Sequence, residues 1–312
     1  MATSGSADFS ITRNEILQKA LERAKILAQG EDMDSEMQNS AQFALNLMTK
    51  EWQADGLNLW AVDREVTLFM VKGQQTYSLG TSGTHAAKTV VSTQMRVAGT
   101  ASDTTLEVDS TTGMTAADNI GIVLSDSTLQ WTTISSVTDS DTLVISDALT
   151  ASSAIDNYIY TYTNKIARPL RVLSARRRVE GGNDVPLEVI SREEYNFQAN
   201  KTANGSVAEV YYDPQLSNGE LSVWPTSDTV KDRVMLTTQR PIEDFDASTD
   251  NPDYPVEWGN ALIWNLAEQL AEEYGKSNNI LKRVQMQAIR SKDRVMKFDR
   301  EDTHILIQPR FY

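Results

Sequence analysis

Residues 254–300 constrain the fold most, because their apolar side chains recur at intervals of three and four over two consecutive segments. Pro255 suits the first turn of a helix, and Gly275 suits the left-handed residue that follows one, so a helix is predicted over residues 256–274. A second helix, predicted over about residues 277–299, spans about 35 Å at 1.5 Å per residue. Because each helix has one apolar side, both need further helices to cover it.

The start of the chain supplies two more helices. Thr12 and Glu15 have the spacing of a capping box, which predicts a helix that begins there and continues to about Gln29. Asp34 or Ser35 is a suitable N-cap for a second helix. The four segments together predict a four-helix domain.

Several other segments have the alternating pattern of β-strands. Residues 66–70 and 75–79 predict a β-hairpin or a short meander. From about residue 84 to residue 163 serine and threonine dominate, and short alternating runs occur at residues 105–108, 120–124, 130–134, 142–145 and 158–162. This pattern predicts a small all-β domain, a sandwich or a barrel, inserted into the helical domain. Further strands are predicted at residues 187–190, 207–212, 220–224 and 233–238, with a short helix at 192–198.

The predicted fold class is therefore α+β, with a four-helix domain, β-hairpin or meander elements and an inserted β-domain. The predicted division is a helical domain in two parts, 1–83 and 164–300, an inserted β-domain at 84–163, and an extended tail at 301–312.

Composition narrows the function. The formal net charge of −14 argues against a general nucleic-acid binder, because contacts with phosphate need local positive charge. The chain has no cysteine, which rules out disulfides and thiolate chemistry. No apolar run approaches the roughly 18 residues that span a bilayer. We expect a soluble product made inside a cell, with no membrane partner.

Signals for catalysis are almost absent. The two histidines, His85 and His304, lack the spacing of a zinc site, and a catalytic triad would have to use one of them. The chain contains neither a nucleophile elbow nor a glycine-rich phosphate loop. We therefore predict no catalytic residue, no metal site and no cofactor, and expect that the protein is not an enzyme.

Two groups of basic residues stand out in this acidic chain. Arg176, Arg177 and Arg178 follow a further predicted strand that begins near residue 166. They are either solvated charges at a hairpin end or contacts for phosphate or an acidic partner. The last predicted helix carries a second group. This group either forms a solvated face of the helix, contacts a neighbouring subunit or lines a channel for DNA. Its members are Lys282, Arg283, Arg290, Lys292, Arg294 and Lys297.

The chain ends in an apolar, β-prone segment beyond the last helix. Its residues are Ile305, Leu306, Ile307, Gln308, Pro309, Arg310, Phe311 and Tyr312. An extended segment of this kind can add a strand to the edge of a partner's sheet.

Three motifs, in this order, resemble the head-to-tail connector (adaptor) proteins of short-tailed phages, also called tail accessory or packaged-DNA stabilisation factors. Residues 50–60 resemble the family's turn W-x-x-D-G after a pair of short helices, and residues 72–80 resemble its strand G-Q-x-x-Y-x-x-G. Residues 254–275 resemble its helix P-x-x-[W/Y] followed by two L-A repeats and [Y/F]-G. The resemblance covers residues 11–80 and about 166–300; the inserted β-domain departs from the smallest members.

The resemblance implies a virion protein at the head–tail junction, made in the host cytoplasm. It implies a homododecameric ring of twelve copies between the portal protein and the tail nozzle protein. Such a ring extends the DNA channel, helps to retain packaged DNA until genome ejection, and lets DNA pass without sequence-specific binding. In this family the C-terminal tail reaches the portal, a role that residues 305–312 would take here.

An alternative function rests on the inserted β-domain. Its aromatic residues Trp131, Tyr158, Tyr160 and Tyr162 would then bind a carbohydrate or a receptor. The same residues are also typical of a sandwich core, and the sequence leaves both interpretations open.

Overall fold

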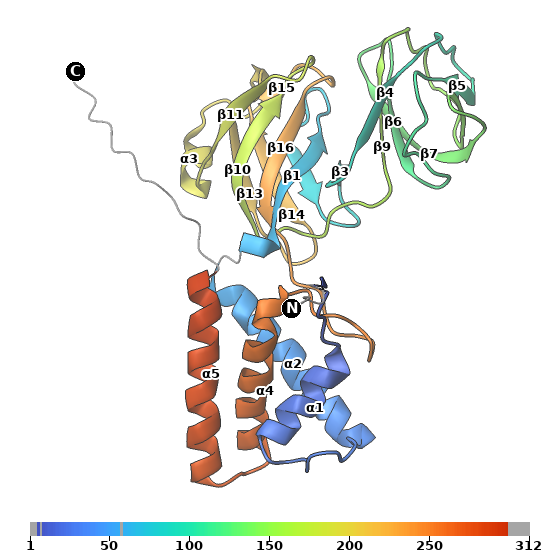
Figure 1. The fold of residues 1–312 in the computed structure, drawn as a ribbon. Helices are drawn as coiled ribbons and strands as arrows, with labels where there is room; N and C mark the ends of the chain where they lie inside the picture. The colour runs from blue at the N-terminus through green and yellow to red at the C-terminus, as the bar shows by residue number, and fades with distance from the viewer. Residues whose placement is uncertain (1–4, 7, 57–58, 299–312) are drawn as a thin grey trace. The chain divides into compact units, whose positions relative to one another are not determined.

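The computed structural model describes residues 5–6, 8–56 and 59–298, and the chain divides into two compact units (Figure 1). The helical unit comprises Met1–Ala61 and Ile242–Tyr312, and the β unit comprises Val62–Pro241. The chain is thus α+β, as predicted. The division differs from the predicted one, which grouped the strands at 66–79 and 166–238 with the helices. Those strands instead join one sheet with a core of its own.

The first helix begins where the sequence predicts and ends earlier. Helix α1, Arg13–Arg23, has Thr12 as its N-cap, and Thr12 and Glu15 form both hydrogen bonds of a capping box. The predicted end near Gln29 is wrong. The backbone leaves the helix at Lys25, whose φ is +58°, and the amides of Ile26 and Leu27 both turn back to the carbonyl of Leu21.

The other helices of this unit follow the predicted pattern with one shift. Asp34 caps helix α2, Ser35–Asp55. A 3₁₀ turn, Val256–Trp258, precedes helix α4, Gly259–Glu273, so Pro255 lies before the turn and not at the first α-helical position. Helix α5, Asn278–Phe298, agrees with its prediction, and Gly275 has the expected left-handed φ of +58°.

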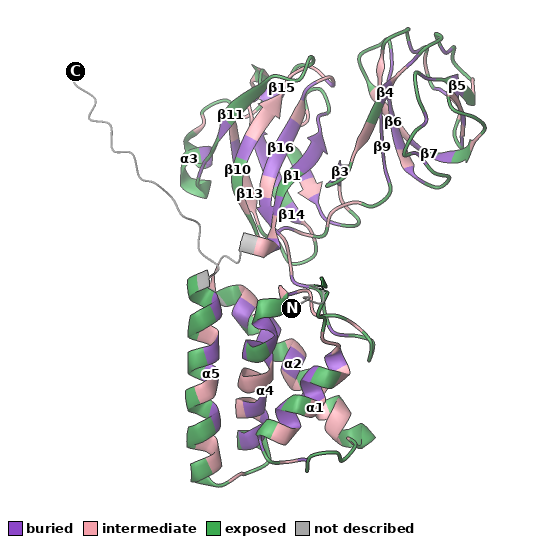
Figure 2. Cartoon of the chain, in the orientation of Figure 1, coloured by how far each residue is buried: buried purple, intermediate pink, exposed green. Residues whose placement is uncertain are grey.

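An aromatic cluster anchors the core of the helical unit. Trp52, Trp60, Tyr254 and Trp258 lie with ring centroids 4.7–6.3 Å apart. Apolar residues of all four helices pack around them, and the buried side of each helix faces inward (Figure 2). These helices thus cover one another's apolar stripes, which is what the periodicity requires.

The β unit contains an eight-stranded sheet in the order β2-β14-β13-β11-β10-β16-β1-β3. The strands are β1 Val62–Phe69, β2 Thr76–Leu79, β3 Ala86–Ala87, β10 Arg171–Arg178, β11 Asp184–Val189, β13 Glu209–Asp213, β14 Gly219–Trp224 and β16 Arg233–Gln239. The β unit also contains helix α3, Arg192–Phe197, and a two-stranded sheet of β12, Asn204–Gly205, and β15, Thr226–Ser227. The predicted hairpin or short meander over residues 66–79 is wrong, because β1 pairs with β16 and β3, whereas β2 pairs with β14.

The inserted segment forms a second sheet, in the order β4-β9-β6-β7-β8-β5. Its strands are β4 Val91–Gln94, β5 Thr105–Glu107, β6 Asn119–Val123, β7 Leu129–Val137, β8 Thr142–Ile145 and β9 Tyr158–Tyr162. A bridge between Met95 and Val108 joins the two ends of this order, so the sheet is a nearly closed barrel. The five predicted strands are confirmed, and β4 is the strand that the sequence analysis missed.

Candidate interaction surface of the helical unit

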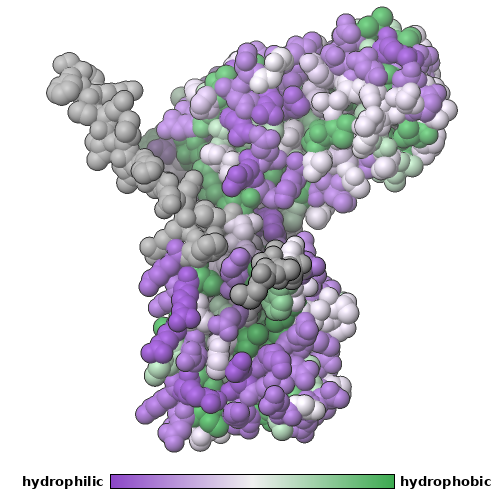
Figure 3. All heavy atoms as spheres, in the orientation of Figure 1, coloured by the Kyte–Doolittle hydropathy of each residue, from purple (hydrophilic) through white to green (hydrophobic). Residues whose placement is uncertain are grey.

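Helix α5 carries a row of exposed basic side chains. Arg290, Arg294 and Lys297 are exposed and, within the ranges that the structure describes, have no ion pair or hydrogen bond. They follow Arg283 at intervals of seven, four and three residues, which places the four along one side of the helix, and we call them the basic row. Lys282 is exposed as well. In the space-filling view hydrophilic residues gather along α5, with a few hydrophobic ones between them (Figure 3).

Lys292 lies on the opposite side of α5. It follows Arg283 by nine positions, which amounts to about two and a half turns. Its ammonium group is 5.0 Å from the ring centroid of Trp52 on α2. The buried side chains of Val284 and Ala288 lie between the two sides. The six basic residues predicted from the sequence therefore do not share one face.

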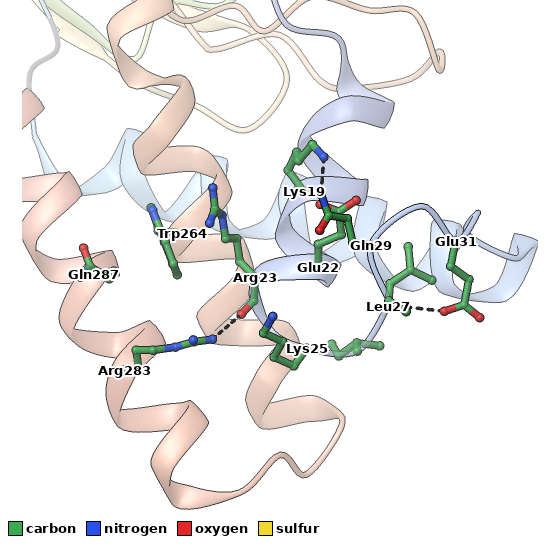
Figure 4. A pocket seen from close by; sticks show the side chains of 12 residues that line it. Lys19, Glu22, Arg23, Lys25, Leu27, Gln29, Glu31, Trp264, Arg283 and Gln287 are labelled. Carbon is green, nitrogen blue, oxygen red and sulfur yellow. Dashed lines mark hydrogen bonds and ion pairs between the residues drawn. The ribbon is translucent and has the colours of Figure 1, made fainter.

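A hollow of about 810 Å³ lies on the Arg283 side of α5, between α1, the turn after it and α4 (Figure 4). We call it the basic hollow, since its charged residues are four cations and two carboxylates: Lys19, Arg23, Lys25, Arg283, Glu22 and Glu31. The guanidinium of Arg23 lies 5.2 Å from the ring centroid of Trp264, and Arg283 donates a 3.2 Å hydrogen bond to the carbonyl of Arg23. Lys19 pairs with Glu22 at 2.9 Å.

The cations of the basic hollow also have a local role. They lie at the end of α1 where the backbone carbonyls concentrate negative charge, so they stabilise that end of the helix. Within the described ranges, Arg23, Lys25 and Arg283 have no carboxylate partner. The sequence analysis missed Arg23, Lys25 and Trp264, because these residues meet only when α1 packs against α4.

A smaller hollow of about 270 Å³ lies on the Lys292 side of α5. We call it the acidic hollow, since three carboxylates and one ammonium group line it: Glu51, Glu268, Glu272 and Lys292. Burial, and then the nearby charge of Glu272, raise the pKa of Glu268 above its ordinary value. Lys292 balances only one of the three carboxylates, so the lining keeps an excess of negative charge beside the partly buried Glu268.

An exposed apolar pair lies on α2, the helix that contributes Glu51 to the acidic hollow. Phe43 and Leu47 of α2 are 72% and 60% exposed, and they precede Glu51 by eight and four residues on the same side of the helix. On α5, Met286 is 51% exposed and lies three residues after Arg283 and four before Arg290, next to the basic row. Each charged region of this unit thus has large apolar side chains beside it.

The three side chains of the arginine triplet, in contrast, form ion pairs within the β unit. Arg176 and Arg178 form ion pairs with Asp184 at 2.7 and 2.8 Å, and both also pair with Glu65. Arg177 points the other way and pairs with Asp232 at 2.8 Å, where both side chains are largely buried. The triplet is therefore explained by the fold, and Arg177 in particular is not available to a partner.

The aromatic residues of the barrel lie where it meets the eight-stranded sheet. Tyr160 and Tyr162 are 1% and 3% exposed, and Phe69 of β1 packs on both and on Trp131. The ring of His85 stacks on Trp131 with centroids 3.9 Å apart. These contacts occupy Trp131, Tyr160 and Tyr162, and the half-buried Tyr158 stacks on Tyr160 with ring centroids 5.9 Å apart.

The environment of His85 makes the β unit sensitive to acid. Burial, and then the charge of Lys165, lower the pKa of His85 from its ordinary 6.5 to about 4. Its Nδ1 forms a hydrogen bond with the Tyr162 hydroxyl. Because the unfolded chain binds a proton near pH 6.5 and the folded chain only near pH 4, the contribution of neutral His85 is complete above pH 6.5 and is lost as the pH falls toward 4.

We therefore expect that the β unit of the unchanged protein loses stability between pH 7 and pH 4.5 relative to His85→Phe, which keeps a ring on Trp131. The measurement is the denaturant midpoint of the β unit at a series of pH values. Parallel pH profiles for the two proteins would contradict this expectation.

Comparisons with known proteins add no further assignment. No protein-family model matches the chain, and no curated protein matches it. Among the described residues, no three histidine, cysteine or acidic side chains are placed to hold a metal ion, and no helix is both long and apolar enough to cross a membrane. His304 and residues 305–312 lie outside the described residues.

Proposed function

We propose that this chain is a structural, non-catalytic adaptor of a short-tailed phage, which forms a ring between the portal protein and the tail nozzle protein. The observation that carries the proposal is the helical unit, in which α5 presents exposed cations without partners among the described residues although the whole chain has a charge of −14. We take this unit as the four-helix adaptor domain that the sequence motifs suggest. The α4 motif supports this, since it ends at a left-handed Gly275.

The proposed role needs no enzyme site. A ring of twelve copies in the virion would extend the DNA channel, help to retain the packaged genome and release it at ejection. A protein that guides moving DNA must not hold it tightly, and a mostly acidic surface with few basic positions meets that requirement. DNA would pass without sequence-specific contacts, and no cofactor would be needed.

The portal contact is assigned to residues 305–312. The segment combines Ile305, Leu306, Ile307, Phe311 and Tyr312 in a short stretch after α5. Such a segment can pair with a sheet edge of the portal through backbone hydrogen bonds, while its alternate side chains enter pockets.

Deletion of residues 305–312 should weaken binding to portal particles by at least about tenfold, or about 1.4 kcal/mol. Binding is measured by co-sedimentation with tail-less particles, and negative-stain images of the complex should show a ring below the portal. The matched control replaces the same eight residues by a glycine–serine stretch of equal length. An unchanged affinity in both variants, with circular dichroism showing intact helices, would refute the assignment of the tail.

A further inference from the structure

We propose that the helical unit binds a second copy of itself head to tail: the basic hollow and basic row of one copy dock on the acidic hollow and the Phe43–Leu47 pair of the next. The inference rests on the proposed function in so far as a ring requires a contact of this kind. It goes beyond that function, because it names the two faces that form the contact and excludes a symmetric dimer, in which both copies would use the same face.

The two faces point in different directions. Arg283 and Lys292 lie on opposite sides of α5, and the two hollows contain one of these residues each. One copy can therefore use both faces at the same time, each with a different neighbour. A contact between unlike faces is heterologous, and it continues from copy to copy until the rotation closes a ring.

The two faces also match in charge and in apolar character. The basic hollow has an excess of two positive charges, and the acidic hollow has an excess of two negative charges. Glu51 of the acidic hollow follows the exposed Leu47 by four residues and Phe43 by eight on α2. On the basic side, Met286 lies three residues after Arg283 and four before Arg290 on α5. A flexible methionine side chain adapts well to aromatic and branched partners.

The overall charge makes this complementarity selective. Two copies of a chain with a charge of −14 repel one another in most orientations. The orientation that brings the basic face of one copy to the acidic face of the next replaces this repulsion with attraction. It also covers the partly buried Glu268 with positive charge.

Cysteine cross-linking tests the contact directly, because the chain contains no cysteine of its own. In the double variant Leu47→Cys/Met286→Cys, a short bismaleimide should give a ladder of dimers, trimers and larger species in the isolated protein at high concentration. Either single variant can form at most a dimer, and we expect little even of that. Leu216→Cys/Met286→Cys is the control, since Leu216 is 94% exposed in the β unit and outside both faces.

Charge reversal identifies the residues responsible. Arg290→Glu or Glu51→Lys, each added to the double variant, should reduce the ladder by at least about tenfold. The two together should restore it, because the charges are then exchanged across the contact. Lys72→Glu, an exposed site in the β unit, should leave the ladder unchanged.

Three results would overturn the inference: no ladder, strong dimers from a single variant, or a ladder that charge reversal does not change. Binding of a single-stranded oligonucleotide that Arg290→Glu abolishes, with no ladder, would assign the basic face to DNA instead. The assay uses the protein alone. An intact ladder without portal binding would thus remove the proposed function and keep the contact, and portal binding without a ladder would do the reverse.

Discussion

Replacing Trp258 by alanine should lower the free energy of unfolding of the helical unit by about 3–5 kcal/mol. The side chain is 2% exposed, and its ring lies 5.6–6.2 Å from those of Trp52, Trp60 and Tyr254. Alanine would remove its contacts and leave a cavity among three large rings that cannot close without moving the helices. The expected result is faster amide hydrogen exchange in α2, α4 and α5, with exchange in the β unit unchanged.

The matched control is Phe43→Ala in the same unit. Phe43 is 72% exposed, so its loss should change the free energy of unfolding by no more than about 0.5 kcal/mol. Both variants are measured in dilute solution, because Phe43 belongs to the proposed contact between copies. Equal losses for the two variants would show that the aromatic cluster does not anchor this unit.

The second large effect is expected in the β unit, where Asp232→Ala should cost about 3–5 kcal/mol. The side chains of Arg177 and Asp232 are only 15% and 9% exposed, and they lie 2.8 Å apart. Without the carboxylate, the guanidinium remains in a largely buried position with no opposite charge beside it. Its Nε already lacks a hydrogen-bond partner among the described residues, which leaves little to compensate. Chemical denaturation of the β unit measures the loss.

Asp184→Ala is the control for this pair. Asp184 accepts hydrogen bonds from Arg176 and Arg178, but its side chain is 31% exposed, so water can replace the lost contacts. Exposed pairs of this kind contribute about 0–1 kcal/mol. A loss for Asp184→Ala as large as that for Asp232→Ala would refute the distinction between the inward and outward arginines.

Features that depend on nearby residues were predicted well from the sequence. The capping box of Thr12 and Glu15 and the left-handed Gly275 are formed within one turn of chain, and they agree with the structure. Strands β8 and β9 have the predicted bounds, since an alternating run closed by polar turns fixes a strand locally.

Strand pairings and individual side-chain contacts between distant residues were not predicted. Tyr77 of β2 pairs with Leu221 of β14, a partner far along the chain that no local pattern indicates. For the same reason, the cations of α5 could be identified from the sequence, but their contacts could not. Lys292 lies over the ring of Trp52, whereas Arg283 donates a hydrogen bond to the carbonyl of Arg23. The hollows arise from packing between α1, α2, α4 and α5, and only the structure brings their residues together.

The helical unit is assembled from the two ends of the chain, and this has a consequence for the order of events during synthesis. α1 and α2 leave the ribosome before the β unit does. The residues of α4 that cover Leu17 and Leu21 of α1 follow only after all of Val62–Pro241. The β unit is then complete while the apolar sides of α1 and α2 still lack their partners. The surface proposed to bind neighbouring copies therefore forms only after α4 and α5 have been made, and a chain that stopped within the β unit would lack it.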